Sequence, residues 1–277
     1  MVQLARNLSF AAAIAHLKQE LGVPEFSPED ALREAVDFYR HQLEQHPEAV
    51  NYLHCRGVQD RRLIQQLSIG YAPGGMLCRH MLRLGYPADL LTQSGLIHQG
   101  KDTFDRRIVF PCWDRSRPVN LYGRSLGGAA PHRFLPRPKG GLFAWNLVGH
   151  HHHVILVEGL FDLAVLWQAG FLNTSCAFGI HLTQTQLAPL SGRPDRTVWI
   201  AFDSDPAGRN AACALAQRLR HTRLSLRMVD LPKGHDPNSF FAAGAAAAEF
   251  HSCLRHAHCL SACATQLKQS STEKERL

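Results

Sequence analysis

The chain has 277 residues, of which 45% are hydrophobic, and it carries a formal net charge of +7 with a pI near 9.1. This length and apolar content allow a sizeable core in one large domain or two modest ones, so we expect a globular protein and not a disordered one. The positive charge favours an anionic partner, although a solvated basic surface would give the same total.

The basic residues are concentrated in one segment, between Lys101 and Lys139. This segment holds nine Lys or Arg residues and three acidic residues. Such a concentration fits binding of nucleic acid or of a triphosphate better than solubility alone.

The eight cysteines are scattered, and no CxxC pair occurs, which is typical of a reduced cytoplasmic protein. No apolar run approaches the roughly 20 residues that a membrane span needs. The apolar opening is interrupted by charged residues and lacks a signal-peptide cleavage site. We therefore expect a cytoplasmic protein without a membrane partner.

The first half of the chain begins with helical patterns. Apolar spacing predicts helices over residues 9–22 and 27–45, with Ser27 as a cap for the second, and shorter helices near 59–67 and 77–84. From residue 107 the pattern changes to two strands, RRIVFPCW and VNLYGRSL, joined by the turn DRSRP. We predict a β-hairpin here, with Pro111 at an edge or a bulge. The Pro- and Gly-rich residues 129–141 are interpreted as a linker or surface loop.

The second half alternates short apolar strands with helices. The predicted strands are residues 154–157, 174–178, 197–202 and 224–229, and the predicted helices are 160–168, 183–190 and 206–220. This alternation is typical of βαβ units, so the fold class is α/β, with a mainly parallel sheet flanked by helices on both faces.

Acidic residues follow two of these strands. Glu158 comes directly after the first strand, and Asp203 and Asp205 come directly after the third. In an extended segment the two aspartates point to one side, and ligands of open parallel sheets bind at the carboxyl ends of strands. Carboxylates gathered there repel one another unless a cation is present, and hard oxygen ligands favour Mg²⁺. The implied chemistry is phosphoryl transfer.

Each acid also has a simpler interpretation. Asp205 is placed to cap the helix that begins at Pro206, Glu158 fits a surface carboxylate at a strand end, and Asp162 fits a solvated helix residue. Asp236, which precedes Pro237, fits a helix cap and a fourth member of the acidic cluster equally well.

These motifs resemble a known family. EGLFD, followed about forty residues later by DSDPAG, resembles the TOPRIM motif of DnaG-type primases, type IA and type II topoisomerases and some nucleases. Upstream, YLHCRGV, SIGYAPGG, DTFDRRIVFPCWD, LYGRSLGG and HRFLP resemble stretches of the basic amino-terminal subdomain of DnaG primases. The resemblance implies an N-terminal helical segment (1–46), a mixed α+β basic subdomain (47–148), a TOPRIM domain (149–236) and a C-terminal helical tail (237–277).

The resemblance also implies a function, the DNA-templated synthesis of short RNA primers on single-stranded DNA from NTPs. Glu158, Asp203 and Asp205 would carry nucleotidyl transfer with Mg²⁺, or with Mn²⁺ as an alternative, and no zinc is expected. Two further acids would lie in the same metal pocket, Asp162 and Asp236. The arginines that would guide the template and hold triphosphates are Arg56, Arg107, Arg124 and Arg133.

The sequence departs from the family in four respects. The family's zinc ribbon and helicase-interaction domain have no counterpart here, which implies a phage, plasmid or mobile-element primase. A separate zinc-ribbon protein or a replicative helicase would then be a further partner. Asn238 stands where primases commonly have an aspartate, and Ala144 where they usually have a glycine. We expect a weakened metal contact or an altered turn.

Two other functions remain open. A TOPRIM nuclease would use the same acids to cleave DNA, although the primase-like upstream motifs argue against it. A catalytically degenerate relative would only bind nucleic acid or partner proteins.

Overall fold

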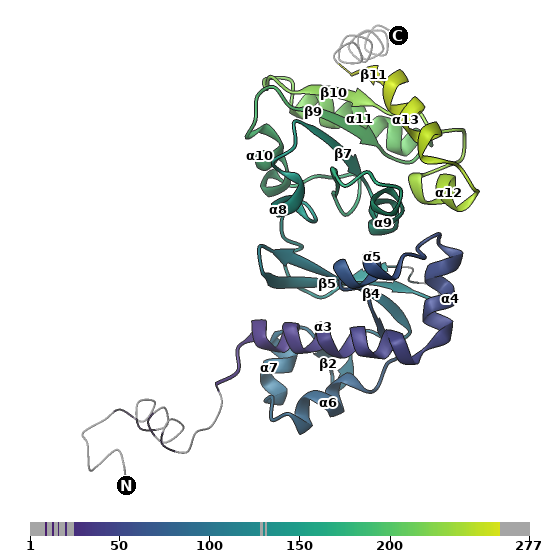
Figure 1. Ribbon diagram of the computed structural model, residues 1–277. Coiled ribbons are helices and arrows are strands. Elements are labelled where there is room, and N and C mark those ends of the chain that lie inside the picture. The colour runs from purple at the N-terminus through teal and green to yellow at the C-terminus, as the bar shows by residue number, and fades with distance from the viewer. Residues whose placement is uncertain are drawn as a thin grey trace, which may run out of the picture.

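The computed structural model describes residues 25–127, 130 and 132–260, together with Ser9, Ala13, His16 and Glu20. The helix expected over residues 9–22 therefore lies largely outside the described residues. Figure 1 shows the described elements as two halves, one below and one above, each built around its own sheet.

The lower half contains an antiparallel sheet with the strand order β1-β4-β5-β6, crossed by the long helix α3. Its paired strands confirm the predicted hairpin, and α3 confirms the helix predicted over 27–45. The elements of this half are α3 (Pro28–Gln45), α4 (Pro47–Cys55), α5 (Arg61–Gln66), β1 (Gly70–Ala72), α6 (Leu77–Arg83), α7 (Ala88–Gln93), β2 (Ile97–His98), β3 (Lys101–Asp102), β4 (Arg107–Asp114), β5 (Arg117–Ser125) and β6 (His132–Phe134).

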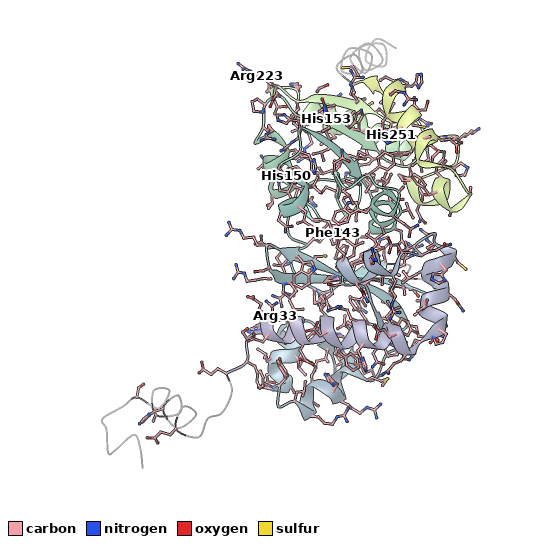
Figure 2. The ribbon with its side chains drawn as sticks, viewed as in Figure 1. Arg33, Phe143, His150, His153, Arg223 and His251 are labelled. Atoms are coloured by element: carbon pink, nitrogen blue, oxygen red, sulfur yellow. The ribbon has the colours of Figure 1, made fainter. Side chains whose placement is uncertain are left out.

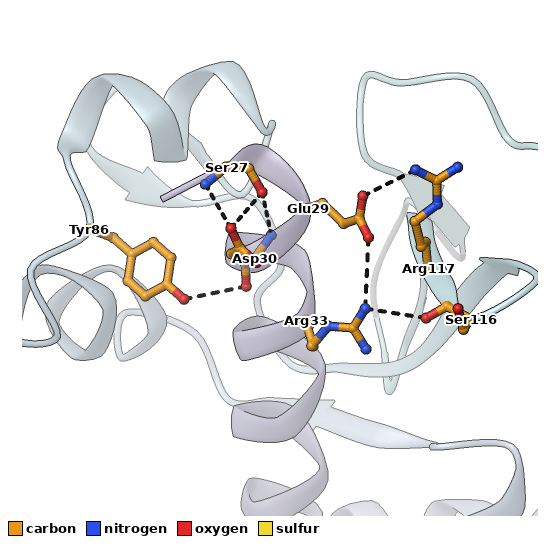
Figure 3. A network of polar contacts seen from close by, with 7 residues as sticks. All are labelled: Ser27, Glu29, Asp30, Arg33, Tyr86, Ser116 and Arg117. Atoms are coloured by element: carbon orange, nitrogen blue, oxygen red, sulfur yellow. Dashed lines mark hydrogen bonds and ion pairs between the residues drawn. The ribbon is translucent and has the colours of Figure 1, made fainter. Parts of the chain in front are cut away.

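Helix α3 begins in a capping box (Figure 3). The Ser27 hydroxyl accepts a hydrogen bond from the Asp30 N–H at 3.1 Å, and the Asp30 carboxylate accepts one from the Ser27 N–H at 2.9 Å. In the same turn, Glu29 forms ion pairs with Arg33 and Arg117. These contacts tie the start of α3 to the turn of the β4–β5 hairpin.

The sequence predicts the position of Pro111 correctly, but it does not predict the strand β6. Pro111 lies beyond the three residues of β4 that pair with β1, and the register shifts just after it, between Cys112 and Trp113. The expected edge or bulge position is therefore present. The expected loop over 129–141 is wrong in part, because β6 pairs with β5. A three-residue strand is too short to show a periodicity of its own, and it forms along the free edge of β5.

The upper half contains a five-stranded sheet with the order β11-β10-β9-β7-β8, in which only β11 is antiparallel to its neighbour. This arrangement confirms the α/β fold with a mainly parallel sheet. Its elements are α8 (Trp145–Val148), β7 (His153–Val157), α9 (Leu160–Gln168), β8 (Thr174–Cys176), α10 (Gln184–Ser191), β9 (Thr197–Ala201), α11 (Pro206–Arg218), β10 (Ser225–Met228), α12 (Pro237–Ala242), α13 (Ala247–His256) and β11 (His258–Cys259).

The end of the described chain is not a continuous helix. Cys259 lies in the short strand β11 and pairs with Arg227 of β10. The backbone groups at the outer edge of β10 are satisfied by this short strand.

Both faces of the upper sheet are buried. Ile155 and Val157 pack with α9 and α13 on one face, whereas Leu156 packs with α10 and α11 on the other. The first of these cores continues into the lower half, and Phe143, labelled between the two halves in Figure 2, belongs to it. Among the described residues, no helix is long and apolar enough to cross a membrane.

Candidate nucleotidyl-transfer site

The parallel pairing of β7 with β9 brings the first two acids together. Val157 and Ala201 are register partners at the ends of these strands, so Glu158 and the loop after β9 begin at the same sheet edge. Glu158 Oε1 accepts a hydrogen bond from the backbone N–H of Asp203 at 3.2 Å. The expected convergence of Glu158 and Asp203 is therefore present in the structure.

The segment that carries Asp203 and Asp205 is a tight loop and not an extended strand, because β9 ends at Ala201. Asp205 caps α11 by accepting a hydrogen bond from the Gly208 N–H at 2.7 Å. A Cβ atom at Gly208 would lie 2.3 Å from the Asp203 carbonyl oxygen, so this close turn requires glycine. Asp205 therefore serves as the helix cap that its position allows, and it also shares a cavity with Asp203.

A hydroxyl between the two aspartates fixes the loop. Ser204 Oγ accepts hydrogen bonds from the backbone N–H groups of Gly234 and His235, at 2.9 and 3.0 Å. The Ser204 N–H in turn donates to the His235 carbonyl at 3.1 Å. The loop after β9 is thereby joined to the loop that leads to Asp236.

The two remaining acids are held by helix N-termini. Asp162 is only 6% exposed, and its carboxylate accepts hydrogen bonds from the N–H groups of Gly159 and Asn238, each at 3.0 Å. It is therefore not the solvated helix residue that its position allows. Asp236 caps α12 through the Ser239 N–H at 2.5 Å, and its charge also acts on the other acids.

The electrostatics of this cluster are those of crowded carboxylates. Burial, followed by repulsion from Asp203, raises the pKa of Glu158 to about 7. Burial, followed by repulsion from Asp236, raises the pKa of Asp162 to about 8, and burial also raises the pKa of Asp203. Within the described part of the chain, no basic side chain forms an ion pair with any of these acids.

One cavity of about 320 Å³ brings these acids into the same space as basic and aromatic side chains. The acids that line it are Glu158, Asp162, Asp203 and Asp236. Its basic and aromatic lining residues include Arg56, Arg124, Lys139, Tyr122, His132, Phe134 and Phe178. Asp205 lines a neighbouring cavity of about 690 Å³, which it shares with Asp203.

The arginines of the shared cavity are held by neutral partners. The Arg56 guanidinium lies 5.0 Å from the centre of the Phe161 ring, and its buried Nε has no hydrogen-bond partner. Arg124 Nε donates to the Tyr52 hydroxyl at 3.4 Å. Because no carboxylate neutralises them, both are available to an anionic ligand.

Arg107 and Arg133 lie elsewhere. Both line a separate cavity of about 310 Å³ together with Arg106 and Asp105. Arg107 donates to the carbonyls of Gly123 and Ala130, and burial together with Arg133 lowers its pKa. Two of the four arginines expected to face the acids therefore do so, and two do not.

Three cavity residues are not among the site residues expected from the sequence, although Tyr122 lies in LYGRSLGG and His132 in HRFLP. Tyr122 comes from β5, His132 from β6, and Lys139 from the loop before α8. Lys139 Nζ lies 4.6 Å from the centre of the Phe134 ring. The sequence signal for Lys139 is its membership of the basic segment between residues 101 and 139, which does not distinguish it from the other basic residues there.

The donor set fits a metal that is shared with substrate. Among the described residues, no three His, Cys, Asp or Glu side chains are arranged so that they could hold a metal ion by themselves. The acids nevertheless offer hard oxygen atoms and an uncompensated negative charge. Mg²⁺ is usually bound through one or two carboxylates, water and substrate phosphates, so it does not need an all-protein cage.

Comparison with known proteins shows what this architecture is. A model described as DNA primase catalytic core, N-terminal domain, matches residues 38–148, and a Toprim-like model matches residues 155–241. The chain belongs to the family of DnaG-type primase catalytic cores. As a family, TOPRIM primases generally use divalent metal ions.

Individual relatives support this assignment. The DNA primase of Aquifex aeolicus (strain VF5) is 30% identical over 266 residues, which cover 86% of this chain and 53% of that protein. The crystal structure of the zinc-binding and RNA polymerase domains of the Aquifex aeolicus primase has a TM-score of 0.76 and 27% identity, covering 99% of this chain and 73% of that chain. A DnaG primase catalytic domain bound to ssDNA has a TM-score of 0.71 and 26% identity, covering 84% of this chain and 80% of that chain. The chain thus spans about half the length of the Aquifex aeolicus primase.

Proposed function

We propose that this protein is a primase that synthesises short RNA primers on a single-stranded DNA template. The observation that carries this proposal is the shared cavity, in which Glu158 and Asp203 lie together with Arg56, Arg124 and Lys139. Nucleotidyl transfer needs both charges, because developing negative charge on phosphate must be neutralised while a hydroxyl is positioned for attack. The relative whose structure was solved bound to ssDNA supports the choice of template.

We assign the metal to the acids at the strand ends. Glu158, Asp203 and Asp205 would hold Mg²⁺, or Mn²⁺ in its place, with Asp162 and Asp236 adding negative charge around them. Such an ion, when bound, polarises phosphate oxygens and lowers the pKa of an attacking hydroxyl. The chain holds these acids in place through the Ser204 contacts and the helix caps.

The basic side chains have two separate roles, contact with the triphosphate and contact with the template. Arg56, Arg124 and Lys139 contact the triphosphate, and Tyr122 and Phe134 offer ring faces for a base. Arg107 and Arg133, which lie in the separate cavity, contact the template backbone instead. Planar guanidinium groups suit bidentate contacts to phosphate.

The wider context of this activity is also a proposal. We propose a cytoplasmic enzyme that works with a replicative helicase or with a separate zinc-ribbon protein. We further propose the division into an N-terminal helical segment, a basic subdomain, a TOPRIM domain and a tail, with boundaries near residues 46, 148 and 236.

A primer-synthesis assay tests the proposal. The protein is incubated with single-stranded DNA, the four NTPs with labelled ATP, and Mg²⁺ or Mn²⁺, with and without a zinc-ribbon protein. Labelled oligoribonucleotides that depend on the template and disappear with Glu158→Gln support it. Cleavage of end-labelled DNA would instead identify a nuclease. DNA binding without any chemistry, unchanged in Glu158→Gln, would identify a degenerate binding protein.

A further inference from the structure

The loop that carries Arg56 is held by two side chains from the other half of the molecule. Gln168, the last residue of α9, accepts hydrogen bonds from the N–H groups of Gln59 and Asp60 at 2.7 and 2.9 Å. Its amide also donates to the Gly57 carbonyl at 2.9 Å. Asn238, in α12, donates its side-chain amide to the Arg56 carbonyl at 2.5 Å.

The backbone of this loop fits closely against the two helices. Gly57 has a φ of +77°, and a Cβ atom there would lie 3.4 Å from Val165 of α9 and 3.7 Å from Ala242 of α12. A positive φ with so little space favours glycine at this position. The loop therefore approaches α9 and α12 through backbone, where their side-chain amides can reach it.

The contact made by Asn238 requires a carboxamide. Asn238 is 2% exposed, its backbone N–H binds Asp162, and its side-chain amide reaches the Arg56 carbonyl. An ionised aspartate offers only acceptor oxygens and could not donate to a carbonyl. Asn238 thus connects the acidic cluster directly to the loop that bears a cavity arginine.

Among the described residues, the side chain of Arg56 has no hydrogen bond like those that hold its backbone. Its guanidinium packs over Phe161, and its buried Nε lacks a hydrogen-bond partner. The fixed backbone therefore decides where this cation lies relative to the acids. A buried donor without a partner is costly unless a ligand satisfies it.

We infer that Asn238 and Gln168 are positioning residues. Their hydrogen bonds anchor the loop from Arg56 to Asp60 and thereby place Arg56 at the acidic cavity, where it binds its anionic ligand. This inference rests on the proposed function for its ligand, a nucleoside triphosphate. The anchoring of the loop by these hydrogen bonds is a property of the fold, and it can be measured without any enzymatic activity.

Amide hydrogen exchange measures how firmly these side chains anchor the loop. Gln168→Ala removes the acceptor of the Gln59 and Asp60 amides, so their exchange should accelerate about 3- to 10-fold, the range expected for one hydrogen bond. Gln168→Glu keeps this acceptor and should leave these two amides protected. The matched control is Gln217→Ala, an exposed glutamine near the end of α11, which should leave the loop unchanged. Unchanged exchange in Gln168→Ala would show that Gln168 does not anchor the loop.

A double-mutant cycle tests the action through Arg56. Asn238→Ala should raise the KM for NTP about 10-fold and change kcat less than about 3-fold, as expected when binding alone is lost. In an Arg56→Ala background, Asn238→Ala should have no further effect on KM, because its target is absent. Additive effects of the two substitutions would overturn the positioning role.

Two further variants separate the possible outcomes. Asn238→Asp should resemble Asn238→Ala, whereas improved catalysis at limiting Mg²⁺ would overturn the inference and show a missing metal ligand. Because Asn238 is buried, exposed Gln168→Ala provides the same KM readout if Asn238 variants do not fold. A wild-type protein that makes no primers would contradict the proposed function. The exchange measurement would still show whether Gln168 anchors the loop.

Discussion

The Glu158 carboxylate accepts a hydrogen bond from the Asp203 backbone N–H, 3.2 Å away, across the ends of two parallel strands. Glu158→Gln preserves an acceptor for this N–H but removes the charge. We therefore expect primer synthesis to fall at least about 100-fold, a typical loss when one electrostatic contribution to the transition state is removed. The initial rate of primer synthesis at saturating NTP and Mg²⁺ measures this change.

The same variant should not unfold the protein. Burial and repulsion disfavour the charged form of Glu158, so its neutral replacement should keep or raise the urea midpoint at pH 7.5. A large loss of stability together with the loss of activity would assign Glu158 a structural role instead.

The stability of the protein should fall as the pH rises toward 8.5, whereas carboxylates paired with a cation would make it rise. The folded-state pKa values of Glu158 and Asp162, about 7 and about 8, lie above their values in an unfolded chain. The folded state therefore binds protons that the unfolded state has released. The contribution of these two groups to stability is fully present below their unfolded pKa values and is lost as pH rises through about 7 and about 8. In EDTA, the melting temperature should fall between pH 5.5 and 8.5.

Two comparisons identify the source of this pH dependence. Mg²⁺ should reduce the slope, because a bound cation stabilises the ionised carboxylates, and Glu158→Gln should reduce it in EDTA. A melting temperature that is constant or rises over this range would contradict the crowded-carboxylate description of the site.

The sequence predicts the acids well because they depend on local order. Glu158 follows a short apolar strand, and Asp203 follows another, so parallel pairing is enough to bring them together. The shape of the loop at Asp203 and Asp205 is not predictable in this way. It depends on Ser204 and on backbone groups near residue 235, which are distant in sequence.

The basic residues are harder to place because they come from a hairpin and its loops. Arg107 pairs with Ser125, and Arg124 pairs with Ile108, so the two arginines extend from opposite faces of the β4–β5 pair and line different cavities. Side-chain direction in a twisted antiparallel sheet depends on register, which a bulge between Cys112 and Trp113 changes. Lys139 and His132 reach the acids only through tertiary packing.

This separation of the arginines should be visible in binding. Arg107→Ala and Arg133→Ala should weaken binding of single-stranded DNA and each reduce the salt dependence of log K by about 0.7, the value for one phosphate contact to a single strand. Arg56→Ala and Arg124→Ala should raise the KM for NTP more than they weaken DNA binding. Fluorescence anisotropy of labelled DNA at several salt concentrations, beside NTP titrations of primer synthesis, measures both. Equal effects of all four on both quantities would contradict the assignment to two cavities.

Ala144, where the resemblance to DnaG primases leads us to expect a glycine, is strained. Ala144 has a φ of +56° and a ψ of 23°, in the left-handed region that costs an L-residue roughly 1 to 2 kcal/mol. Ala144→Gly removes that cost but adds entropy to the unfolded chain, so we expect a net gain of about 0.5 to 1 kcal/mol in the free energy of unfolding. Urea denaturation at constant m-value measures this gain.

The matched control is an alanine to glycine change in ordinary helical conformation. Ala214 is exposed within α11, and Ala214→Gly should lower the free energy of unfolding by about 1 kcal/mol, because glycine is the poorer helix former. Opposite signs for the two substitutions would trace the effect to the backbone at Ala144. If both variants lose stability equally, the packing of the Ala144 methyl group against the core outweighs its backbone strain.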